Sequence, residues 1–580
     1  MIVPLNQVAM GEKKADIVLK NGKLVNVYSR EIVPDAQIAI FRDRIAYVGR
    51  DAGHTVGERT AVIDLEGKFV TPGFADPHIH MDQYVLPSEL AKHSLLCGTT
   101  ALFSDPIDIV SVCGYRGFRE FVRMTEALPV RVFHMMPGGL PVDRKFSHAR
   151  TISHAEQRQA LRLHAVLGMG EVFSWTKVTT LDRETIQNMR QVIESGGIVN
   201  GHTAGASDRK LNAYIASGIF SCHEPIDYDQ LLERLRLGMW VMMREGSIRR
   251  DLERMVPTLL SKKTYLDRLM FCTDGVTPSD LLRYGLIDHC VRKSVELGMD
   301  PVDAVTVASR NCFEYYGMGD DLGGVAPGKL ADILVFEDLE KRPDKVFVGG
   351  RLLVAHGNLV FQGSRAAFPK WITNTVRTGG KFSEKDFGVR GKGETARATV
   401  IRLDTEIITR KDSEELSVRD GNVQASRDKD VWKVAAMDRT YGTRRRCVGF
   451  LRNLGADIGA FGSTQSFHEN DMIVIGSSEK EMSLVANELA RIRGGMAVSK
   501  DGKIVARLKM PFAGLASKDS VEDAAAAFQG LDQSIVDAGC KFPQPHLIPL
   551  FLPFLALPEV RILYSGVVDV KARTYLKVVT

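Results

Sequence analysis

The sequence lacks any Cys-x-x-Cys pair, although it contains eight cysteines in 580 residues. Most of these cysteines lie in apolar runs such as "SLLCGTT" and "LMFCTDG". This pattern argues against a disulfide framework and predicts buried, reduced thiols. We therefore expect a cytoplasmic protein.

Signals for a membrane or a nucleic-acid partner are also missing. The N-terminal residues have no basic region followed by an apolar signal core. The longest apolar run, "LIPLFLPFLALP", is broken by prolines and is too short to span a bilayer. The 76 Lys and Arg against 71 Asp and Glu leave a net charge of only +5, which argues against a dedicated nucleic-acid binder.

The length predicts two to four domains, and short strands occur at both flanks of a long middle segment. "ADIVLKNGKLVNV", with a hairpin turn expected at Asn21-Gly22, and "AQIAIFRDRIAYVG" come first; "GKLADILVFEDL", "KVFVGGRLLVAHG" and "GNLVFQG" come far downstream. We predict one small composite β-domain, formed by residues 1–70 and 323–368.

Between these flanks, residues 71–322 alternate strand-like and helical patterns, as repeated βα units do. Eight strand ends follow in order: "GFADPHIH", "TTALFSDP", "VRVFHMMP", "GMGEVFSW", "GGIVNGHTAG", "GIFSCHEP", "GMWVMMREGS" and "RLMFCTDG". The count predicts an α/β fold, a (β/α)8 barrel of the TIM type, whose chemistry lies at the C-terminal ends of the strands. A charged linker over 369–400 and a C-terminal α+β domain over 401–580 complete the prediction.

Ionisable side chains gather at these strand ends. In "ADPHIH", His78 and His80 point the same way if the stretch is a strand, with Asp76 in register behind them. An isolated His-x-His pair is more often only a strand end, but Glu171, His202, His223 and Asp274 occupy further strand ends, and the chain has only 14 histidines. Imidazole and carboxylate ligands suit Zn²⁺, Mn²⁺ or Fe²⁺, and a carboxylate can bridge two such ions.

This pattern resembles the amidohydrolase superfamily, and longer stretches resemble its adenine deaminase family. Those stretches include "GHTAGASDRKLNAYIASGI", "CHEPIDYDQLLERLRLGMWVMMREGS" and, in the third domain, "DMIVIGSSEKEMSLVANELARIRGGMAVSKDG". The resemblance covers nearly the whole chain. It implies a divalent metal, two ions per chain (Mn²⁺ or Fe²⁺, with Zn²⁺ as an alternative), a purine or related heterocycle as small-molecule substrate, and a homo-oligomer.

The resemblance assigns the metal ligands to the residues at the strand ends, namely His78, His80, Glu171, His202, His223 and Asp274. Asp274, together with Glu171, takes the catalytic role, because a carboxylate beside a metal-activated water accepts its proton and returns it to the leaving ammonia. The alternative role for Asp274 is a helix N-cap, a position that Ser279 fills equally well.

Four further residues are candidates for substrate binding: Asp82, Asp108, Arg244 and Glu245. Arg244 and Glu245 could instead form a surface ion pair. The chain departs from the family pattern at Met81–Tyr84, at Ile107, at Gly275 and around His468, which affects the neighbourhood of the predicted metal site.

These observations lead to three hypotheses. The first is a metal-dependent hydrolytic deaminase that converts adenine to hypoxanthine and ammonia. The second is a metal-dependent hydrolase of another aminated heterocycle or of a cyclic amide. The third is a non-enzymatic protein that keeps the barrel as an interaction scaffold. Loss of metal ligands would favour this third hypothesis, but none of the six predicted ligands is lost.

Overall fold

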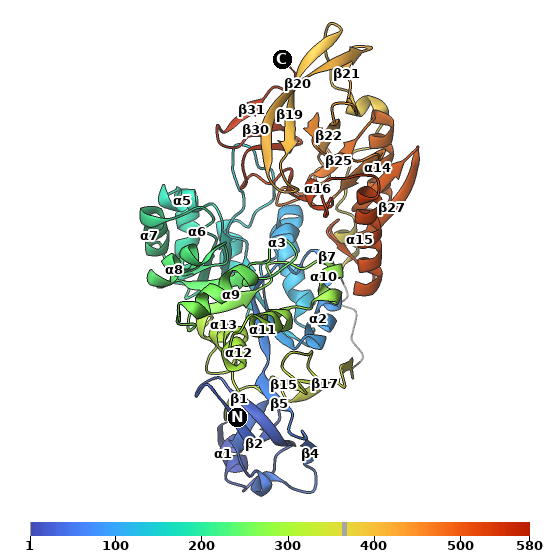
Figure 1. Ribbon diagram of the computed structural model, residues 1–580. Coiled ribbons are helices and arrows are strands. Elements are labelled where there is room, and N and C mark those ends of the chain that lie inside the picture. Colours follow the sequence, from blue (N-terminus) through green and yellow to red (C-terminus); the bar gives the residue numbers. More distant parts are fainter. Residues whose placement is uncertain (1, 362–367, 580) are drawn as a thin grey trace.

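The computed structural model describes residues 2–361 and 368–579. Along the chain it forms a β-domain, a barrel and a C-terminal α+β part, and Figure 1 shows the β-domain and the C-terminal part at opposite ends of the barrel. Within the described residues, no helix is both long and apolar enough to cross a membrane.

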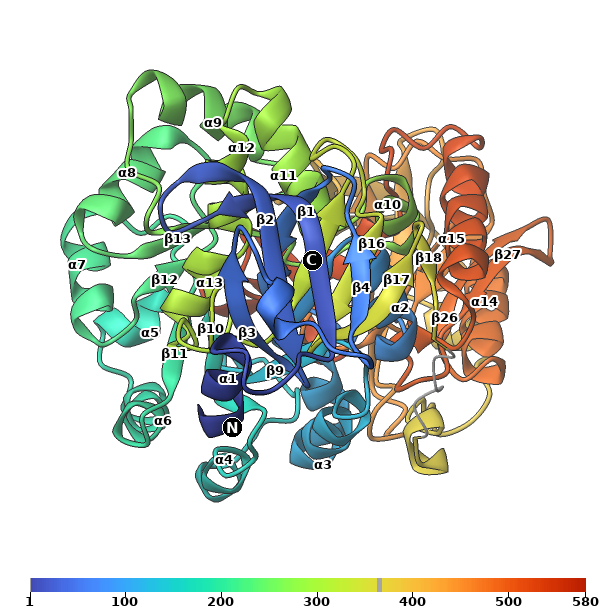
Figure 2. The same ribbon diagram turned by 90° about the horizontal axis from the view of Figure 1, so that it is seen from below.

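The β-domain is one sheet built from both flanks of the barrel, as predicted. The N-terminal flank has helix α1 (Ile2–Ala9) and strands β1 (Ile17–Asn26), β2 (Glu31–Phe41), β3 (Arg44–Gly49), β4 (Ala61–Asp64) and β5 (Phe69–Pro72). The second flank adds β15 (Ile333–Phe336), β16 (Lys345–Val348), β17 (Arg351–Ala355) and β18 (Asn358–Leu359). Antiparallel pairing of β5 with β15 joins the two halves, and Figure 2 shows this sheet from below. Positions 362–367, part of the predicted second half, lie outside the described residues.

The predicted hairpin turn at Asn21-Gly22 is wrong. Strand β1 continues through these residues, and its register with β2 shifts on either side of Gly22. Asn21 adopts a φ of 59°, and a Cβ on Gly22 would lie 2.8 Å from the Val70 side chain. The irregularity lets β1 pair first with β4 and then with β5. The left-handed conformation therefore serves a bulge in a continuous strand.

The eight predicted barrel strands are all present and parallel. They are β6 (Phe74–Ile79), β8 (Thr99–Ser104), β9 (Arg131–Met136), β10 (Val166–Val172), β11 (Ile198–Gly201), β12 (Ser221–Cys222), β13 (Trp240–Arg244) and β14 (Leu269–Cys272). Past the end of β6, the amide of His80 donates to Asp274 O (3.0 Å) and the amide of Asp274 donates to His78 O (3.0 Å). These two bonds tie β6 to β14 at the edge where the predicted site lies.

Helices surround the strands. They are α2 (Pro87–Leu96), α3 (Ile107–Thr125), α4 (His154–Ala160), α5 (Trp175–Thr179), α6 (Arg183–Glu194), α7 (Asp208–Ala216), α8 (Tyr228–Arg236), α9 (Leu252–Ser261), α10 (Pro278–Arg283), α11 (Ile287–Glu296), α12 (Pro301–Ala308) and α13 (Arg310–Tyr315). Helical spacing places Ile109, Phe118 and Phe121 of α3 in the main apolar core. The packing leaves the strand ends as the place where polar side chains meet.

The C-terminal part is built on a nine-stranded sheet. Its strands are β19 (Thr395–Leu403), β20 (Thr409–Arg419), β21 (Asn422–Val423), β22 (Val431–Met437), β23 (Arg446–Arg452), β24 (Ala460–Ser463), β25 (Met472–Gly476), β26 (Gly495–Lys500) and β27 (Lys503–Lys509). Helices α14 (Glu479–Arg491), α15 (Val521–Val536) and α16 (Leu547–Phe551) and the small sheet β29 (Val560–Leu563), β30 (Gly566–Asp569) and β31 (Thr574–Leu576) pack with it. The predicted Asp501-Gly502 turn joins β26 to β27. Because β19 begins within 369–400, we propose 395 as the start of this part.

The C-terminal part is attached to the loop that follows the first barrel strand. Strand β7 (Tyr84–Val85) pairs in parallel with β28 (Ala516–Ser517). The Asn470 amide donates to Asp108 Oδ1 at 3.1 Å. The attachment brings C-terminal residues to the edge of the barrel that carries the strand ends.

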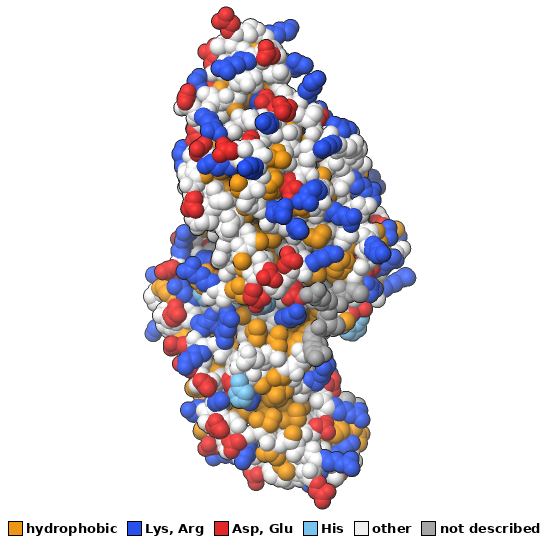
Figure 3. Space-filling view, turned by 90° about the vertical axis from the view of Figure 1, so that its right-hand side faces the viewer, with side chains coloured by type: hydrophobic (Ala, Val, Ile, Leu, Met, Phe, Trp, Pro, Cys, Tyr) orange, Lys and Arg blue, Asp and Glu red, His pale blue; other side chains and the backbone are white. Residues whose placement is uncertain are grey.

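Figure 3 shows charges of both signs interspersed over the upper part of one face and hydrophobic side chains gathered on its lower part.

A partly buried ion pair joins the barrel to the composite sheet. Arg131 donates two hydrogen bonds of 2.8 Å to Asp332, which also accepts from the amide of Gly349 at 2.8 Å. Asp332→Ala leaves these donors without a partner and should cost about 1–3 kcal/mol of stability. We expect a lower midpoint of thermal unfolding than for the exposed control Glu340→Ala. Equal midpoints for the two variants would contradict the role given to this pair.

Candidate metal centre

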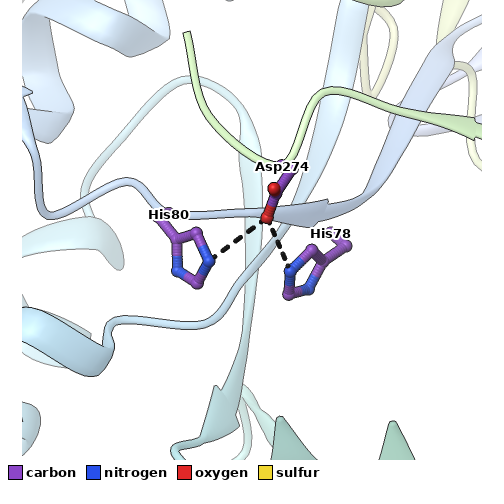
Figure 4. A group of neighbouring side chains, drawn as sticks. All are labelled: His78, His80 and Asp274. Carbon is purple, nitrogen blue, oxygen red and sulfur yellow. Dashed lines mark ion pairs between the residues drawn. The ribbon is translucent and has the colours of Figure 1, made fainter. Parts of the chain in front are cut away.

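The two histidines of the first strand and the aspartate after the eighth converge on one point. His78 Nε2 lies 3.2 Å and His80 Nε2 lies 3.3 Å from the same oxygen, Oδ1, of Asp274. Figure 4 shows both imidazoles directed at this carboxylate. The two-residue periodicity of a strand explains why both rings face the same side.

Glu171 lies between this group and the remaining two histidines. Its Oε2 is 2.6 Å from His202 Nδ1 and 3.3 Å from His223 Nε2. Its Oε1 is 3.6 Å from His80 Nε2. The rings of His78 and His223 stack with centroids 4.2 Å apart. All six predicted ligands therefore meet, with the two oxygens of one carboxylate facing different imidazoles.

The donor set fits a divalent cation. Three groups each hold their ligand atoms within 4.8 Å of one another: His78, His80 and Asp274; His78, Glu171 and His223; His202, His223 and Glu224. The side chains of His78 and His223 are buried. Among the described residues, three of their ring nitrogens have no hydrogen-bond partner: Nδ1 and Nε2 of His78 and Nε2 of His223. Buried polar atoms without partners are costly. Imidazole nitrogens and carboxylate oxygens are ligands that such an ion satisfies.

Asp105, at the end of the second strand, orients two of the ligands. Its backbone oxygen lies 2.7 Å from His80 Nδ1. Because a carbonyl only accepts, Nδ1 carries a proton, and Nε2 is the ring nitrogen that faces Asp274. Asp105 Oδ2 also accepts from the amide of Glu171 at 2.8 Å. Asp76 supports the eighth strand, since its Oδ2 accepts from the Thr273 hydroxyl at 2.6 Å.

Arg244 links two buried carboxylates beside the cluster. It donates to Asp274 Oδ2 and lies 3.0 Å from Glu224 Oε1. Burial, the largest single effect, would raise the pKa of both carboxyls. The Arg244 charge and the neighbouring histidines, joined by Arg249 for Glu224, together more than offset it, so the pKa of Asp274 is held well below its usual value and that of Glu224 is lowered to about 2. Arg244 is itself buried, so the surface ion pair considered for it is wrong.

Sequence reasoning missed Glu224 and Arg249. Arg249 holds Glu224 Oε2 at 3.0 Å and donates to the backbone oxygen of His223 at 3.1 Å. Their positions in the sequence could have indicated both residues. Glu224 directly follows a strand-end histidine in "SCHEP", and Arg249 lies five residues after Arg244.

Asp82 and Asp108 lie together next to the first two strands. The amide of Ile109 donates to Asp82 Oδ2 at 2.7 Å, and the Gln83 side chain donates to Asp108 Oδ2 at 2.9 Å. Burial, and then the nearby Asp108 carboxylate, raise the pKa of Asp82 to about 8. Both residues are fully buried between the barrel and the C-terminal part.

Glu245, the fourth predicted substrate-binding residue, points away from the metal ligands. Its carboxylate accepts from the Leu252 amide at 3.2 Å, at the start of α9, and so turns to the helix layer. The N-cap alternative for Asp274 is also wrong, because the Thr277 side chain caps α10 by accepting from the amide three residues on. Ser279, suggested for the same position, lies inside α10.

Comparison with known proteins gives the family of this chain. Residues 69–353 match the model of the amidohydrolase family, and residues 406–574 match that of the adenine deaminase C-terminal domain. An adenine deaminase of Cenarchaeum symbiosum is 54% identical over 99% of this chain and 94% of its own length. Adenine deaminases of Moorella thermoacetica (34% identical over 97% of this chain and 95% of theirs) and Kosmotoga olearia (33% over 98% and 97%) are also similar. Likeness of this degree over nearly whole chains means that this chain belongs to the adenine deaminase family.

Proposed function

We propose that this protein is a metal-dependent hydrolase that converts adenine to hypoxanthine and ammonia. The full-length similarity to proteins named adenine deaminase supports the reaction. The observation that carries the mechanism is the position of Glu171, whose two oxygens face different histidines beside Asp274. A site with four imidazoles and three carboxylates in contact suits hydrolysis of a C–N bond.

We propose two divalent ions per chain, Mn²⁺ or Fe²⁺, with Zn²⁺ as an alternative. One would be held by His78, His80 and Asp274, the other by His202 and His223, with Glu171 between them. A bound ion supplies an activated water near neutral pH and stabilises developing negative charge.

Asp274 serves as the general base and then as the general acid. Asp274 is paired with the Arg244 guanidinium as a carboxylate, so it can accept a proton from the attacking water. The water oxygen bonds to C6 of adenine as the C6–N1 π bond opens, giving a tetrahedral carbon with the electron pair on N1. The C6–N1 π bond then reforms as the bond to the exocyclic amino group breaks, the proton on Asp274 passes to that group, and it leaves as ammonia. The remaining 6-hydroxypurine is a tautomer of hypoxanthine. Arg244 holds the other carboxylate oxygen and so orients the base.

A second substrate class remains a candidate because of Ile107. The side chain is fully buried and packs with Val142, Phe146 and Phe173, so this wall is apolar where the family pattern has an imidazole. This apolar wall offers the substrate no hydrogen bond through the Ile107 side chain. It would therefore suit another aminated heterocycle, or a cyclic amide, that needs fewer hydrogen bonds on this side than adenine does. Retention of all six ligands disfavours the scaffold hypothesis. Self-association and the cytoplasmic location stay predictions.

The substrate assignment is tested by ammonia release. Protein loaded with Mn²⁺ or Fe²⁺ should release ammonia from adenine faster than from a panel of other aminopurines and aminopterins. Cyclic amides are tested beside them by chromatography of the ring-opened product, because their hydrolysis releases no ammonia. No ammonia from adenine, together with turnover of another panel member, would refute adenine and leave the hydrolase mechanism in place.

Asp274→Asn should abolish turnover, because an amide cannot accept the proton of the attacking water. We expect a loss in kcat of at least about 10²- to 10⁴-fold, the range of a general base. Asn tolerates the φ of 64° at this position, so the fold should persist. Glu245→Gln is the matched control, and it should retain turnover because Gln can still accept from the Leu252 amide. Comparable kcat values for Asp274→Asn and wild type would assign the base elsewhere.

A further inference from the structure

His468, which belongs to the C-terminal part, lies one aromatic ring away from the metal centre. Its imidazole stacks on the ring of Phe173, with centroids 5.2 Å apart and an angle of 18°. Phe173 follows the fourth barrel strand, and its ring centroid is 6.1 Å from that of His202. Phe554 packs edge-on against His468 at 4.8 Å. Three rings from both parts of the protein therefore form an aromatic wall next to a predicted ligand.

The Nδ1 atom of this imidazole has no hydrogen-bond partner among the described residues. His468 is only 4% exposed, and within the described ranges its Nδ1 makes no hydrogen bond. The nearest acidic atom, Asp108 Oδ1, is 3.6 Å away, which is beyond hydrogen-bond distance. Asp108 Oδ1 already accepts from Asn470. Since buried polar atoms are nearly always partnered in folded proteins, the orphaned nitrogen indicates a ligand.

Other unpartnered atoms occur in the same region. In the part of the chain that the structure describes, Asp82 Oδ1, Glu469 Oε1 and both side-chain polar atoms of Gln465 also lack hydrogen bonds, and all three residues are buried. Elsewhere in this segment polar groups are satisfied: Asn470 bonds to Asp108, and Asp471 Oδ1 lies 2.7 Å from His148 Nε2. The orphaned atoms therefore do not reflect a poorly packed interface in general.

We propose that His468 is a specificity-determining residue, which donates or accepts a hydrogen bond through Nδ1 at a ring nitrogen of the substrate while Phe173 fixes the plane of its imidazole. This inference rests on the proposed function, because it assumes an aminated nitrogen heterocycle at the metal centre. A flat, partly apolar wall with one directional polar atom suits such a ring. The C-terminal part then contributes directly to substrate recognition.

Three substitutions separate the hydrogen bond from the packing. His468→Phe keeps a ring on Phe173 and removes the nitrogen, whereas His468→Asn keeps a polar nitrogen close to the Nδ1 position. We expect His468→Phe to lower kcat/KM for adenine by about 10- to 100-fold, mainly through KM, with metal content unchanged. His468→Asn should recover part of the loss. Phe467→Leu, which alters the same aromatic packing without touching a polar atom, should leave KM near the wild-type value.

Inhibition by deaza analogues gives a readout that a structural role would not move. The wild type should bind either 3-deazaadenine or 7-deazaadenine more weakly than adenine, and His468→Phe should abolish that difference. Unchanged KM and an unchanged analogue pattern in His468→Phe would overturn the inference. If the wild type deaminates another heterocycle and not adenine, the proposed substrate fails, and the KM of that heterocycle in the same variants decides the role of His468.

Discussion

The burial of three carboxylates that share histidine and arginine partners is the constraint on which the site depends. Asp274, Glu171 and Glu224 are each less than one tenth exposed. Removing ionised groups from water costs several kcal/mol each unless opposite charges compensate. Arg244 and Arg249 compensate part of this charge through ion pairs with Glu224 and, for Arg244, with Asp274. The remaining negative charge and the unpartnered imidazole nitrogens are what a divalent metal would balance.

The backbone places these charges with little freedom. Reciprocal hydrogen bonds between His80 and Asp274 and between Asp274 and His78 close the barrel at the site itself, so the first and eighth strands share ligands. Asp105 fixes Glu171 and His80 from the second strand. Orientation by groups outside the ligand set reduces the reorganisation needed when substrate binds. The barrel supplies this rigidity, and the C-terminal part covers the edge where Asp82 and Asp108 lie and contributes His468.

Much of this arrangement could be predicted from the sequence, because period-two alternation and strand-end position follow from backbone geometry alone. His78, His80 and Glu171 were found in this way. The error at Asn21-Gly22 arose because a left-handed residue serves a bulge as well as a turn, and only the pairing of β1 with both β4 and β5 decides between them. Glu224 and Arg249 were missed because ion-pair partners across strands leave no local periodicity.

The most direct test of the central claim is anomalous X-ray diffraction from crystals of the protein loaded with Mn²⁺. The account predicts two anomalous peaks, one between His78, His80 and Asp274 and one beside His202 and His223, with Glu171 bridging them. Peaks elsewhere on the protein, or well-defined density in which Glu171, His202 and His223 point away from one another, would contradict it.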